Sequence, residues 1–492
     1  MNKIEHLNFT NSYADLPAEF FSYTQPTSLK KPFFIHINHD IANTLELDIS
    51  SKSTDSNLIY LSGQSTLPST KPLAQCYAGH QFGHFVPRLG DGRAIILGEI
   101  NTSKNQKWDL QIKGGGKTLY SRDGDGRAVL RSTIREYLCS EAMHALGIET
   151  TQSLCMIGSK EEVYREKIET GALLLRVAPS HVRFGTFEYF YYNNQHDNIP
   201  VLADYVLEHH FPDLKELDNP YIALLETAID KTAKMIAQWQ SVGFAHGVMN
   251  TDNMSILGLT LDYGPFGFLD AYEPSFICNH SDHQGRYAFD KQPNIGLFNV
   301  SCLAQALLPT LDDNPEKAVE LAKAALDTYK YLYAKHYSSC MRAKLGLQLK
   351  HDADQDLNQA LLNLMAEDRV DYTIFFRQLS TYSPTEDSTR IRDLFLQREK
   401  FDEWENLYKK RLTHEPLSEY HRHESMKNIN PKYILRNYMA EIAIQKAENE
   451  DYSEIELLIE ILKKPFDEHH EYEQYAGLPP DWANSISVSC SS

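Results

Sequence analysis

The pattern of apolar and polar positions divides the chain into a strand-rich N-terminal part and a helical remainder. Residues 95–100 are rich in aliphatic side chains, and apolar residues alternate with polar ones from 108 to 112, so both runs predict β-strands. From 130 to 146 apolar positions recur every three or four residues and a glycine follows, which predicts an amphipathic helix. Its expected core-facing positions are Ile134, Leu138, Ala142 and Ala145.

The remainder of the chain is mostly helical in period. A further strand is expected at 173–178, and the amphipathic run 222–239 predicts a helix. Residues 1–70 mix aromatic residues with Pro, Ser and Thr, and the polar stretch 48–57 is typical of a loop. The predicted C-terminal helical segments are 297–311, 315–347, 354–380, 390–412, 431–448 and 452–464. This order predicts an α+β protein with a largely helical C-terminal extension.

Composition narrows the class of protein. The 492 residues are 42% hydrophobic, which is ample for a sizeable core, and the formal net charge of −19 disfavours nucleic-acid binding as the main activity. The N-terminus lacks the features of a signal peptide, and no apolar run reaches the roughly eighteen residues of a membrane span. We therefore expect a cytoplasmic protein that binds neither nucleic acid nor membrane. The seven cysteines form no Cys-x-x-Cys pair, so we expect mostly buried thiols.

The segment 246–264 holds the densest group of chemically useful side chains. Asp252 and Asn253 precede the strand-like run 254–257, and a second apolar run at 259–261 leads to Asp262-Tyr-Gly. Two loops separated by short strands would bring two carboxylates and a carboxamide together, and these are hard oxygen ligands suited to a magnesium ion that carries nucleotide phosphates. The alternative is a pair of ordinary turns rich in Asn, Asp and Gly.

Segment 246–264 matches the catalytic motifs of protein kinases only in part. Kinases place a base in His-Arg-Asp, a metal-binding Asn five residues later, and then Asp-Phe-Gly. Here Val248 stands where the base belongs, and Asn253 is five residues further on, in the place of the metal-binding Asn. Asp252 is the remaining carboxylate of this loop. Because it is displaced by four residues from the usual base, the hydroxyl that it activates should attack a different point along the triphosphate.

Glycine-rich loops come before these segments and are suited to close approach of a phosphate. They include Leu89-Gly-Asp-Gly-Arg and two runs at 114–118 and 123–127. The Walker motif fails because Gln111 stands where its first glycine belongs, and a calcium loop fails at Arg127. In the neighbouring run 77–85, His80 and His84 lie at helical spacing and could bind a metal, although turn or core positions are favoured.

Four charged residues complete the candidate nucleotide site. Lys113 ends the strand at 108–112 and can reach phosphates as a fixed cation. Glu136 follows it by 23 residues, close to the kinase pattern in which a helix glutamate pairs with the strand lysine, although a solvated carboxylate is the alternative. Arg176 and Arg183 are flanked by apolar residues and need an anionic partner, either a triphosphate or structural carboxylates.

Taken together, these motifs resemble the SelO/YdiU family of selenoprotein-O-like pseudokinases over nearly the whole chain. The segments that carry the resemblance are 77–83, 89–94, Lys113 with the following glycines, 123–127, 246–255, 262–264, 430–437 and the C-terminal 488–492. The resemblance implies a protein-kinase-like two-lobed fold and transfer of AMP from ATP to Ser, Thr or Tyr hydroxyls of target proteins. A conventional phosphotransferase and a catalytically dead scaffold are the alternatives.

The resemblance also implies roles for individual residues. Asp252 would be the base, Glu136 would orient Lys113, and Asn253 and Asp262 would bind Mg²⁺, or Mn²⁺ in its place. The nucleotide would contact Gly90, Gly92, Arg93, Lys113, Asp125, Gly126, Arg176, Arg183 and Asp262. We expect an N-terminal extension over 1–70, a small lobe over 71–200, a large lobe over 201–340 and a helical region over 341–492.

Two cysteines raise a hypothesis of redox control. Cys278 follows the Asp-Tyr-Gly triplet by about sixteen residues in the chain, and Cys490 lies on a tail of small polar residues that could reach back to it. In a reducing compartment such a pair would be labile and regulatory. Two unrelated thiols are the alternative. Animal members of the resembled family carry selenocysteine near the C-terminus, so a cysteine at 490 implies weaker and slower redox chemistry.

Overall fold

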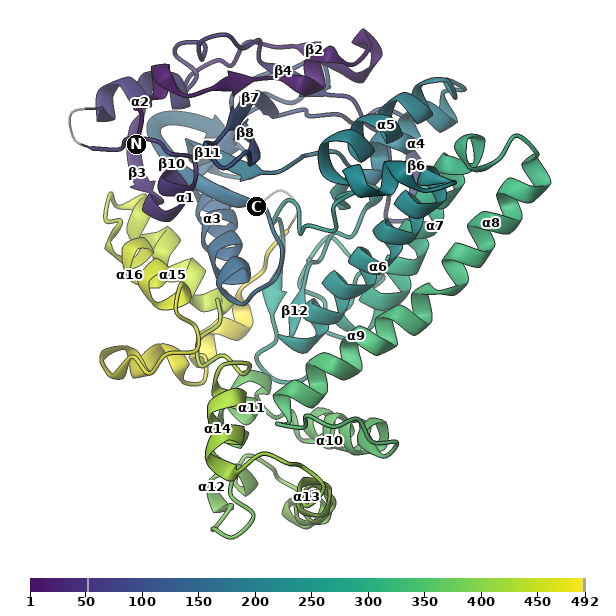
Figure 1. The fold of residues 1–492 in the computed structure, drawn as a ribbon. Helices are drawn as coiled ribbons and strands as arrows, with labels where there is room; N and C mark the ends of the chain where they lie inside the picture. The colour runs from purple at the N-terminus through teal and green to yellow at the C-terminus, as the bar shows by residue number, and fades with distance from the viewer. Residues whose placement is uncertain (51–52, 490–492) are drawn as a thin grey trace.

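A computed structural model describes residues 1–50 and 53–489 and shows a mixed α/β protein (Figure 1). The strands of the main sheet all lie before residue 179, and the chain beyond them is mainly helical. This arrangement confirms the mixed α and β content expected from the sequence. The stretch 48–57 is not only loop, because helix α2 (Thr54–Leu61) begins within it.

The main sheet is antiparallel and has the order β2-β4-β7-β8-β11-β10-β3, with β1 paired to β7 and β9 to β11. Its strands are β1 (Phe9–Thr10), β2 (Phe21–Tyr23), β3 (Phe33–Ile37), β4 (Leu73–Gln75), β7 (Ala94–Asn101), β8 (Lys107–Lys113), β9 (Ala128–Val129), β10 (Gln152–Tyr164) and β11 (Ile168–Ala178). Leu173 and Leu175 pack with the N-terminal segments, and Leu174 packs on the opposite face. Both faces of the sheet are therefore covered, which holds its central strands rigidly.

Helix α3 (Leu130–Ala145) covers one face of the sheet (Figure 1). Ile134 and Leu138 are fully buried and Ala142 nearly so, whereas Ala145 is only partly buried. Gly147 follows with φ of +76°, a left-handed conformation that glycine adopts at low cost and that ends the helix. The hydrophobic spacing therefore predicted this helix and its buried face correctly up to the last turn.

The other helices pack beside and below the sheet. They are α1 (His39–Thr44), α4 (Phe184–Tyr192), α5 (Asn198–His210), α6 (Pro220–Ser241), α7 (Gln292–Leu311), α8 (Pro315–Asp327), α9 (Tyr329–Lys344), α10 (Asp354–Asp368), α11 (Tyr372–Leu379), α12 (Thr389–Arg392), α13 (Arg398–Leu412), α14 (Glu419–Lys427), α15 (Asn437–Glu448) and α16 (Ser453–Leu462). The predicted helix 315–347 is thus two helices that meet at Thr328. Among the described residues one stretch, Phe289–Leu311, is long and apolar enough to cross a membrane, but 56% of its most apolar window is buried inside the protein.

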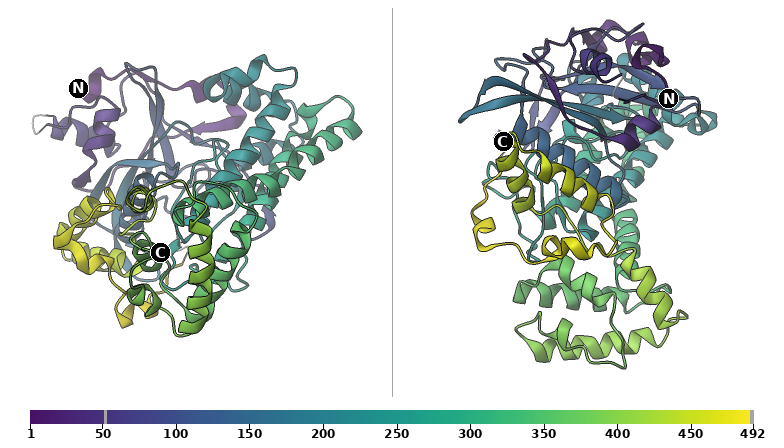
Figure 2. Two further views of the ribbon diagram at one scale, coloured as in Figure 1. Left: turned by 60° about the horizontal axis from the view of Figure 1, so that its bottom comes forward. Right: turned by 90° about the vertical axis from the view of Figure 1, so that its left-hand side faces the viewer.

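The C-terminal helices form two separate groups (Figure 2). Helices α10 to α14 lie at the end far from the sheet, and Phe375, Phe401 and Trp404 belong there to a second hydrophobic cluster, which also includes Leu269 and Cys278. Helices α15 and α16 return to the middle of the molecule and pack against α3. The last part of the chain therefore supports the helix that carries Glu136.

The segment 430–437 connects these parts through buried polar contacts. Arg436 is 1% exposed and forms ion pairs with Asp270 at 2.5 Å and Asp371 at 2.9 Å. The next residue, Asn437, accepts a hydrogen bond at 3.1 Å from Arg135 of α3, and Arg135 also donates to the carbonyl of Phe266. The segment therefore ties α3 to the chain that follows the Asp-Tyr-Gly triplet.

Replacing Arg436 should destabilise the fold strongly. Arg436→Met leaves the buried carboxylate of Asp371 without its cation, and breaking such a pair costs about 3–5 kcal/mol. The urea midpoint of unfolding measures the effect. Lys160→Met is the control, because the Lys160–Glu450 pair is exposed on both sides and should contribute little. Equal midpoints for the two variants would contradict a structural role for the buried pair.

Candidate active site

A cleft of about 720 Å³ lies where the glycine-rich loops of the sheet face the loops of segment 246–264. Its lining includes Gly90, Gly92, Arg93, Lys113, Asp125, Gly126, Arg176, Arg183, Asp252, Asn253 and Asp262. These positions are spread over more than 170 residues of sequence, and the fold brings them to one cavity. Glu136 lies behind Lys113, in contact with its ammonium group.

The carboxylate of Glu136 holds two cations. Its Oε2 accepts from Nζ of Lys113 at 2.5 Å, and its Oε1 accepts from Nε of Arg176 at 2.5 Å. Glu136 comes from α3, Lys113 from the end of β8 and Arg176 from β11, so helix packing on the sheet sets this geometry. All three side chains are buried, and a buried charge needs such partners. The expected contact between Glu136 and Lys113 is present, and Arg176 is a second cation on the same carboxylate.

Asp262 approaches the same two cations from the opposite side of the cleft. Its Oδ1 accepts from Lys113 at 2.8 Å and from Arg176 at 2.5 Å. Burial alone would raise the pKa of Asp262, but the charges of Lys113, Arg176 and Arg93 outweigh it and hold the pKa well below its usual range. The residue has φ of +56°, a left-handed conformation that Asp tolerates better than most residues. Asp262 is therefore ionised and fixed in place by its backbone.

Asp252 lies in a different electrostatic setting. It is 8% exposed on the short 3-10 helix Thr251–Asn253, and its Oδ2 accepts from Nε2 of Gln81 at 3.2 Å. Its Oδ1 is buried and has no hydrogen-bond partner among the described residues. Burial raises its pKa to about 6, against smaller lowering effects from Arg183 and Gln81. Asp252 and Asp262, which line the same cleft, therefore differ in basicity because their surroundings shift their pKa values in opposite directions.

The chain packs closely around Asp252. A side chain at Gly79 would place its Cβ 2.6 Å from Oδ1 of Asp252, and one at Gly185 would meet the carbonyl of Ala78 at 2.1 Å. Arg183 donates from Nη1 to the carbonyl oxygen of Asp252 at 2.6 Å. These contacts leave Asp252 little freedom to move.

Asn253 presents one side of its amide to the cleft. Its Nδ2 donates to the carbonyl of Val248 at 3.0 Å, so its Oδ1 is left to accept or to bind a cation. The flanking strands expected at 254–257 and 259–261 do not form in the described structure, where these runs take part only in isolated bridges, which pair Met254 with Thr260, Ser255 with Arg183 and Thr260 with Thr150. Gly258 has φ of +70° and turns the chain too tightly for a ladder to extend.

The glycine loop at 123–127 is closed by an ion pair. Arg165 forms a bidentate pair with Asp125 at 2.8 and 2.9 Å, so the carboxylate points to Arg165 in this structure. Gly126 has φ of +71°, and a Cβ there would lie 2.1 Å from the carbonyl of Gly116. This position therefore requires glycine, because the two loops cross at it.

The two arginines singled out from the sequence have different partners. Arg176 pairs with the carboxylates of Glu136 and Asp262, so structural carboxylates are its partners in this structure. The guanidinium of Arg183 lies over the ring of Tyr77 at 4.9 Å. Both are buried at the cleft, where an incoming anion would compete for them.

Sequence reasoning missed the role of Gln81, and it misjudged the geometry of the two histidines beside it. The helical spacing of His80 and His84 has no meaning here, because β5 (Gly79–Gln81) and β6 (His84–Val86) form a hairpin that pairs Gln81 with His84. His84 is exposed, whereas His80 faces Glu188. The motif was visible in the sequence, but only the fold shows that its glutamine reaches Asp252.

Cys278 packs beneath the same loops. It is 8% exposed, its thiol lies 3.4 Å from the carbonyl of Ala245, and a Cβ on Gly247 would lie 2.7 Å from its sulfur. Cys490 lies outside the described residues, so the redox pair stays a prediction. The nearby tail does return to this region, because the carbonyl of Val488 accepts from the amide of His280 at 2.8 Å. Cysteines 76, 139, 155, 278 and 302 are buried as expected, and Cys340 is partly buried.

Comparison with known proteins now identifies the family. The family model described as protein adenylyltransferase SelO matches residues 3–463. This chain belongs to the SelO family. Among similar SelO-family proteins, those named protein nucleotidyltransferase YdiU from Thioalkalivibrio sulfidiphilus, Myxococcus xanthus and Thiobacillus denitrificans are 54%, 50% and 50% identical, and each alignment covers the whole of both chains. The resemblance found in the sequence is therefore confirmed over the full length.

The cleft of this SelO-family chain combines three kinds of chemical group in one cavity. Lys113, Arg176 and Arg183 offer buried positive charge for an anion, and Asn253 with Asp262 offers oxygen ligands. Asp252 adds a carboxylate that is ionised at neutral pH but remains more basic than an exposed one. Such a set suits transfer of a phosphorus-containing group to an acceptor that must lose a proton.

Proposed function

We propose that this chain is a protein adenylyltransferase that transfers AMP from ATP to Ser, Thr or Tyr hydroxyls, in a two-lobed cleft like that of protein kinases. The observation that carries the proposal is the position of Asp252, a carboxylate of raised pKa in the loop that follows Val248. Val248 lines the cleft where a kinase has its base, and an aliphatic side chain cannot accept a proton. Asp252 is buried nearby, its pKa is raised to about 6, and its carboxylate can accept the proton. Family membership and the names of the relatives support the same reaction.

The proposed step joins the acceptor to the α-phosphate. The hydroxyl oxygen forms a bond to the α-phosphorus, and the bond from that phosphorus to the oxygen bridging to the β-phosphate breaks. Asp252 accepts the hydroxyl proton, and pyrophosphate leaves with the bonding electrons. A base with a pKa of about 6 is ionised at neutral pH and still accepts a proton readily, which is the compromise that general-base catalysis favours.

The buried cations would hold the phosphates. Lys113 and Arg176 are both fixed by Glu136, so they keep their positions when Asp262 turns to another partner. Arg183 and Arg93 line the same cleft and add positive charge. We assign Arg176 and Arg183 to the terminal phosphates, which become the leaving pyrophosphate, because stabilising the leaving group lowers the barrier.

The oxygen donors of the second loop fit a hard divalent cation. Asn253 has its amide oxygen free because Nδ2 is engaged by Val248, and Asp262 is ionised. An amide oxygen and a carboxylate are ligands that Mg²⁺ or Mn²⁺ accepts. An ion bound there would neutralise charge that develops at the α-phosphate. Asp262 would have to release at least one of its two cations to bind it.

The proposed partners are ATP and target proteins with Ser, Thr or Tyr acceptors. We expect neither nucleic acid nor membrane as a partner, because the net charge is −19 and the apolar stretch Phe289–Leu311 is largely internal. A cytoplasmic location agrees with these expectations and with the seven cysteines, which are few for a chain of this length.

Labelled ATP tests the reaction. With α-labelled ATP we expect label on protein and release of pyrophosphate, and with γ-labelled ATP none on protein. Asp252→Ala should lower the rate by about 10²–10⁴-fold, with much less effect on ATP binding, because it removes only the base. Protein labelled from the γ-position alone would favour an ordinary kinase. Tight ATP binding without label from either position would favour a scaffold.

The pH dependence tests the role of Asp252. A base works only when ionised, so kcat/KM should fall about ten-fold per pH unit below the Asp252 pKa of about 6 and level off above it. Gln81→Leu removes a hydrogen bond that lowers this pKa, so its profile should shift to higher pH. The exposed Gln64→Leu is the matched control. If the pH profile of Gln81→Leu did not shift, Asp252 would not be the group whose ionisation controls kcat/KM.

Asp262→Ala tests the metal assignment. We expect it to abolish magnesium-dependent ATP binding measured by calorimetry, because a metal ligand is lost. In chelator, however, it should bind ATP at least as tightly as the parent, since Lys113 and Arg176 lose their competing carboxylate. Asp290→Ala, an exposed aspartate, is the control. A variant that binds Mg-ATP as tightly as the parent would show that Asp262 does not hold the metal.

A further inference from the structure

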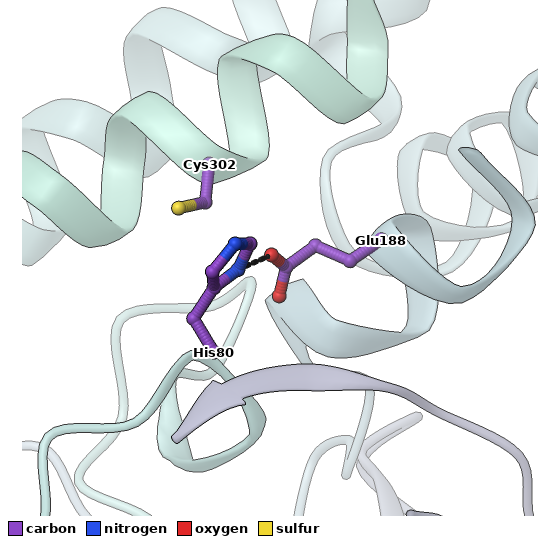
Figure 3. A group of neighbouring side chains, drawn as sticks. All are labelled: His80, Glu188 and Cys302. Carbon is purple, nitrogen blue, oxygen red and sulfur yellow. Dashed lines mark hydrogen bonds and ion pairs between the residues drawn. The ribbon is translucent and has the colours of Figure 1, made fainter. Parts of the chain in front are cut away.

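A second group of ligating side chains lies outside the cleft. His80 of the β5–β6 hairpin, Glu188 of α4 and Cys302 of α7 come together from three separate elements (Figure 3). Nδ1 of His80 lies 2.5 Å from Oε1 of Glu188, and one ligating atom from each of the three residues lies within 4.8 Å of the others. Figure 3 shows the thiol and the carboxylate on either side of the imidazole ring.

The group is enclosed and its polar atoms are not all satisfied. Glu188 is fully buried, and its Oε2 has no hydrogen-bond partner among the described residues. The rings of Phe85, Tyr192 and Phe298 surround the imidazole, with centroids 5.3, 5.9 and 5.6 Å away. A buried carboxylate with an unpartnered oxygen is costly, so the site favours a cation.

The donor atoms indicate which cation. An imidazole nitrogen, a carboxylate oxygen and a thiolate sulfur are the ligand types of zinc sites, whereas magnesium prefers oxygen alone. Around one tetrahedral Zn²⁺, with bonds of about 2.0–2.3 Å, neighbouring ligand atoms lie roughly 3.3–3.7 Å apart. The contact between His80 and Glu188, at 2.5 Å, would therefore open by about 1 Å to admit the ion, and any pair near the 4.8 Å limit would close by about 1 Å. We propose that His80, Glu188 and Cys302 bind one Zn²⁺ ion, leaving the fourth position to water.

Charge balance favours a zinc site over a reactive cysteine at Cys302. A thiolate, a carboxylate and a neutral imidazole compensate a divalent ion fully, which suits an enclosed site. Without the ion, burial and then the charge of Glu188 raise the pKa of Cys302, whereas Arg286 lowers it.

The site would act on the hairpin that supports the proposed base. The amide of His80 donates to Oγ1 of Thr251 at 2.7 Å, and the next residue, Gln81, donates to Asp252. An ion on His80 would fix this hairpin against α4 and α7. This consequence rests on the proposed function, whereas binding of zinc does not.

Cobalt titration of the metal-free full chain tests the site. Co²⁺ bound by a thiolate gives a near-ultraviolet charge-transfer band, and Zn²⁺ should remove that band at one equivalent per chain. Cys302→Ser should abolish the band, and both Cys302→Ser and His80→Gln should weaken zinc binding by more than about ten-fold. Cys340→Ser on α9 controls for loss of a cysteine, and Asp262→Ala controls for binding in the cleft. Both controls should bind zinc as the parent does.

Two outcomes would overturn the proposal. One is a parent chain that gives no thiolate–cobalt band, a result that needs no variant to fold. The other is zinc binding that is equally tight in Cys302→Ser and the parent, with circular dichroism showing both folded, because the ion would then lie on other residues. Failure of AMP transfer in a chain that binds zinc at Cys302 would instead count against the proposed function alone.

Discussion

The buried carboxylate of Glu136 is the interaction on which the cleft depends. It joins β8, β11 and α3 by holding Lys113 and Arg176 at 2.5 Å each. Removing one partner of such a buried group typically costs about 3–5 kcal/mol, because the remaining charge has no water to solvate it. The positions of both cations therefore depend on the position of α3. Helices α15 and α16 pack against α3, so the C-terminal part of the chain also helps to position the cations.

In this structure, charged side chains of the cleft pair with one another. Asp262 neutralises the two cations from across the cavity, so the charged groups already form a closed set. On the proposed function, a nucleotide phosphate would compete with this carboxylate, and a divalent ion would draw it away. The left-handed backbone of Asp262 keeps the carboxylate where both exchanges would occur. Nucleotide and metal would then be coupled, because each would weaken the interaction that excludes the other.

The sequence predicted the contact between neighbouring elements with clear hydrophobic periods, but not the contacts between residues that lie far apart in the chain. Lys113 ends a strand and Glu136 lies on a helix, and the hydrophobic periods of both elements are clear in the sequence. Their pairing could therefore be predicted from the order of the two elements and the spacing of the two residues. Gln81 and Arg436 escaped prediction because their partners lie 171 residues and 166 residues away, at Asp252 and Asp270. Short apolar runs such as 254–257 were misleading, since a glycine turn and contacts with α4 outweigh strand propensity there.

Placing the proposed base at Asp252, and not at position 248, also changes which groups support it. Gln81 of the β5–β6 hairpin donates a hydrogen bond to Asp252, Gly79 leaves room for its carboxylate that a Cβ would fill, and Arg183 donates to its backbone carbonyl. Its basicity is therefore set from the side of the hairpin and α4, not by the glycine loops that would hold the nucleotide. On the proposed function, an event that moves the hairpin would alter proton transfer before it alters phosphate binding, because Lys113 and Arg176 are fixed independently by Glu136.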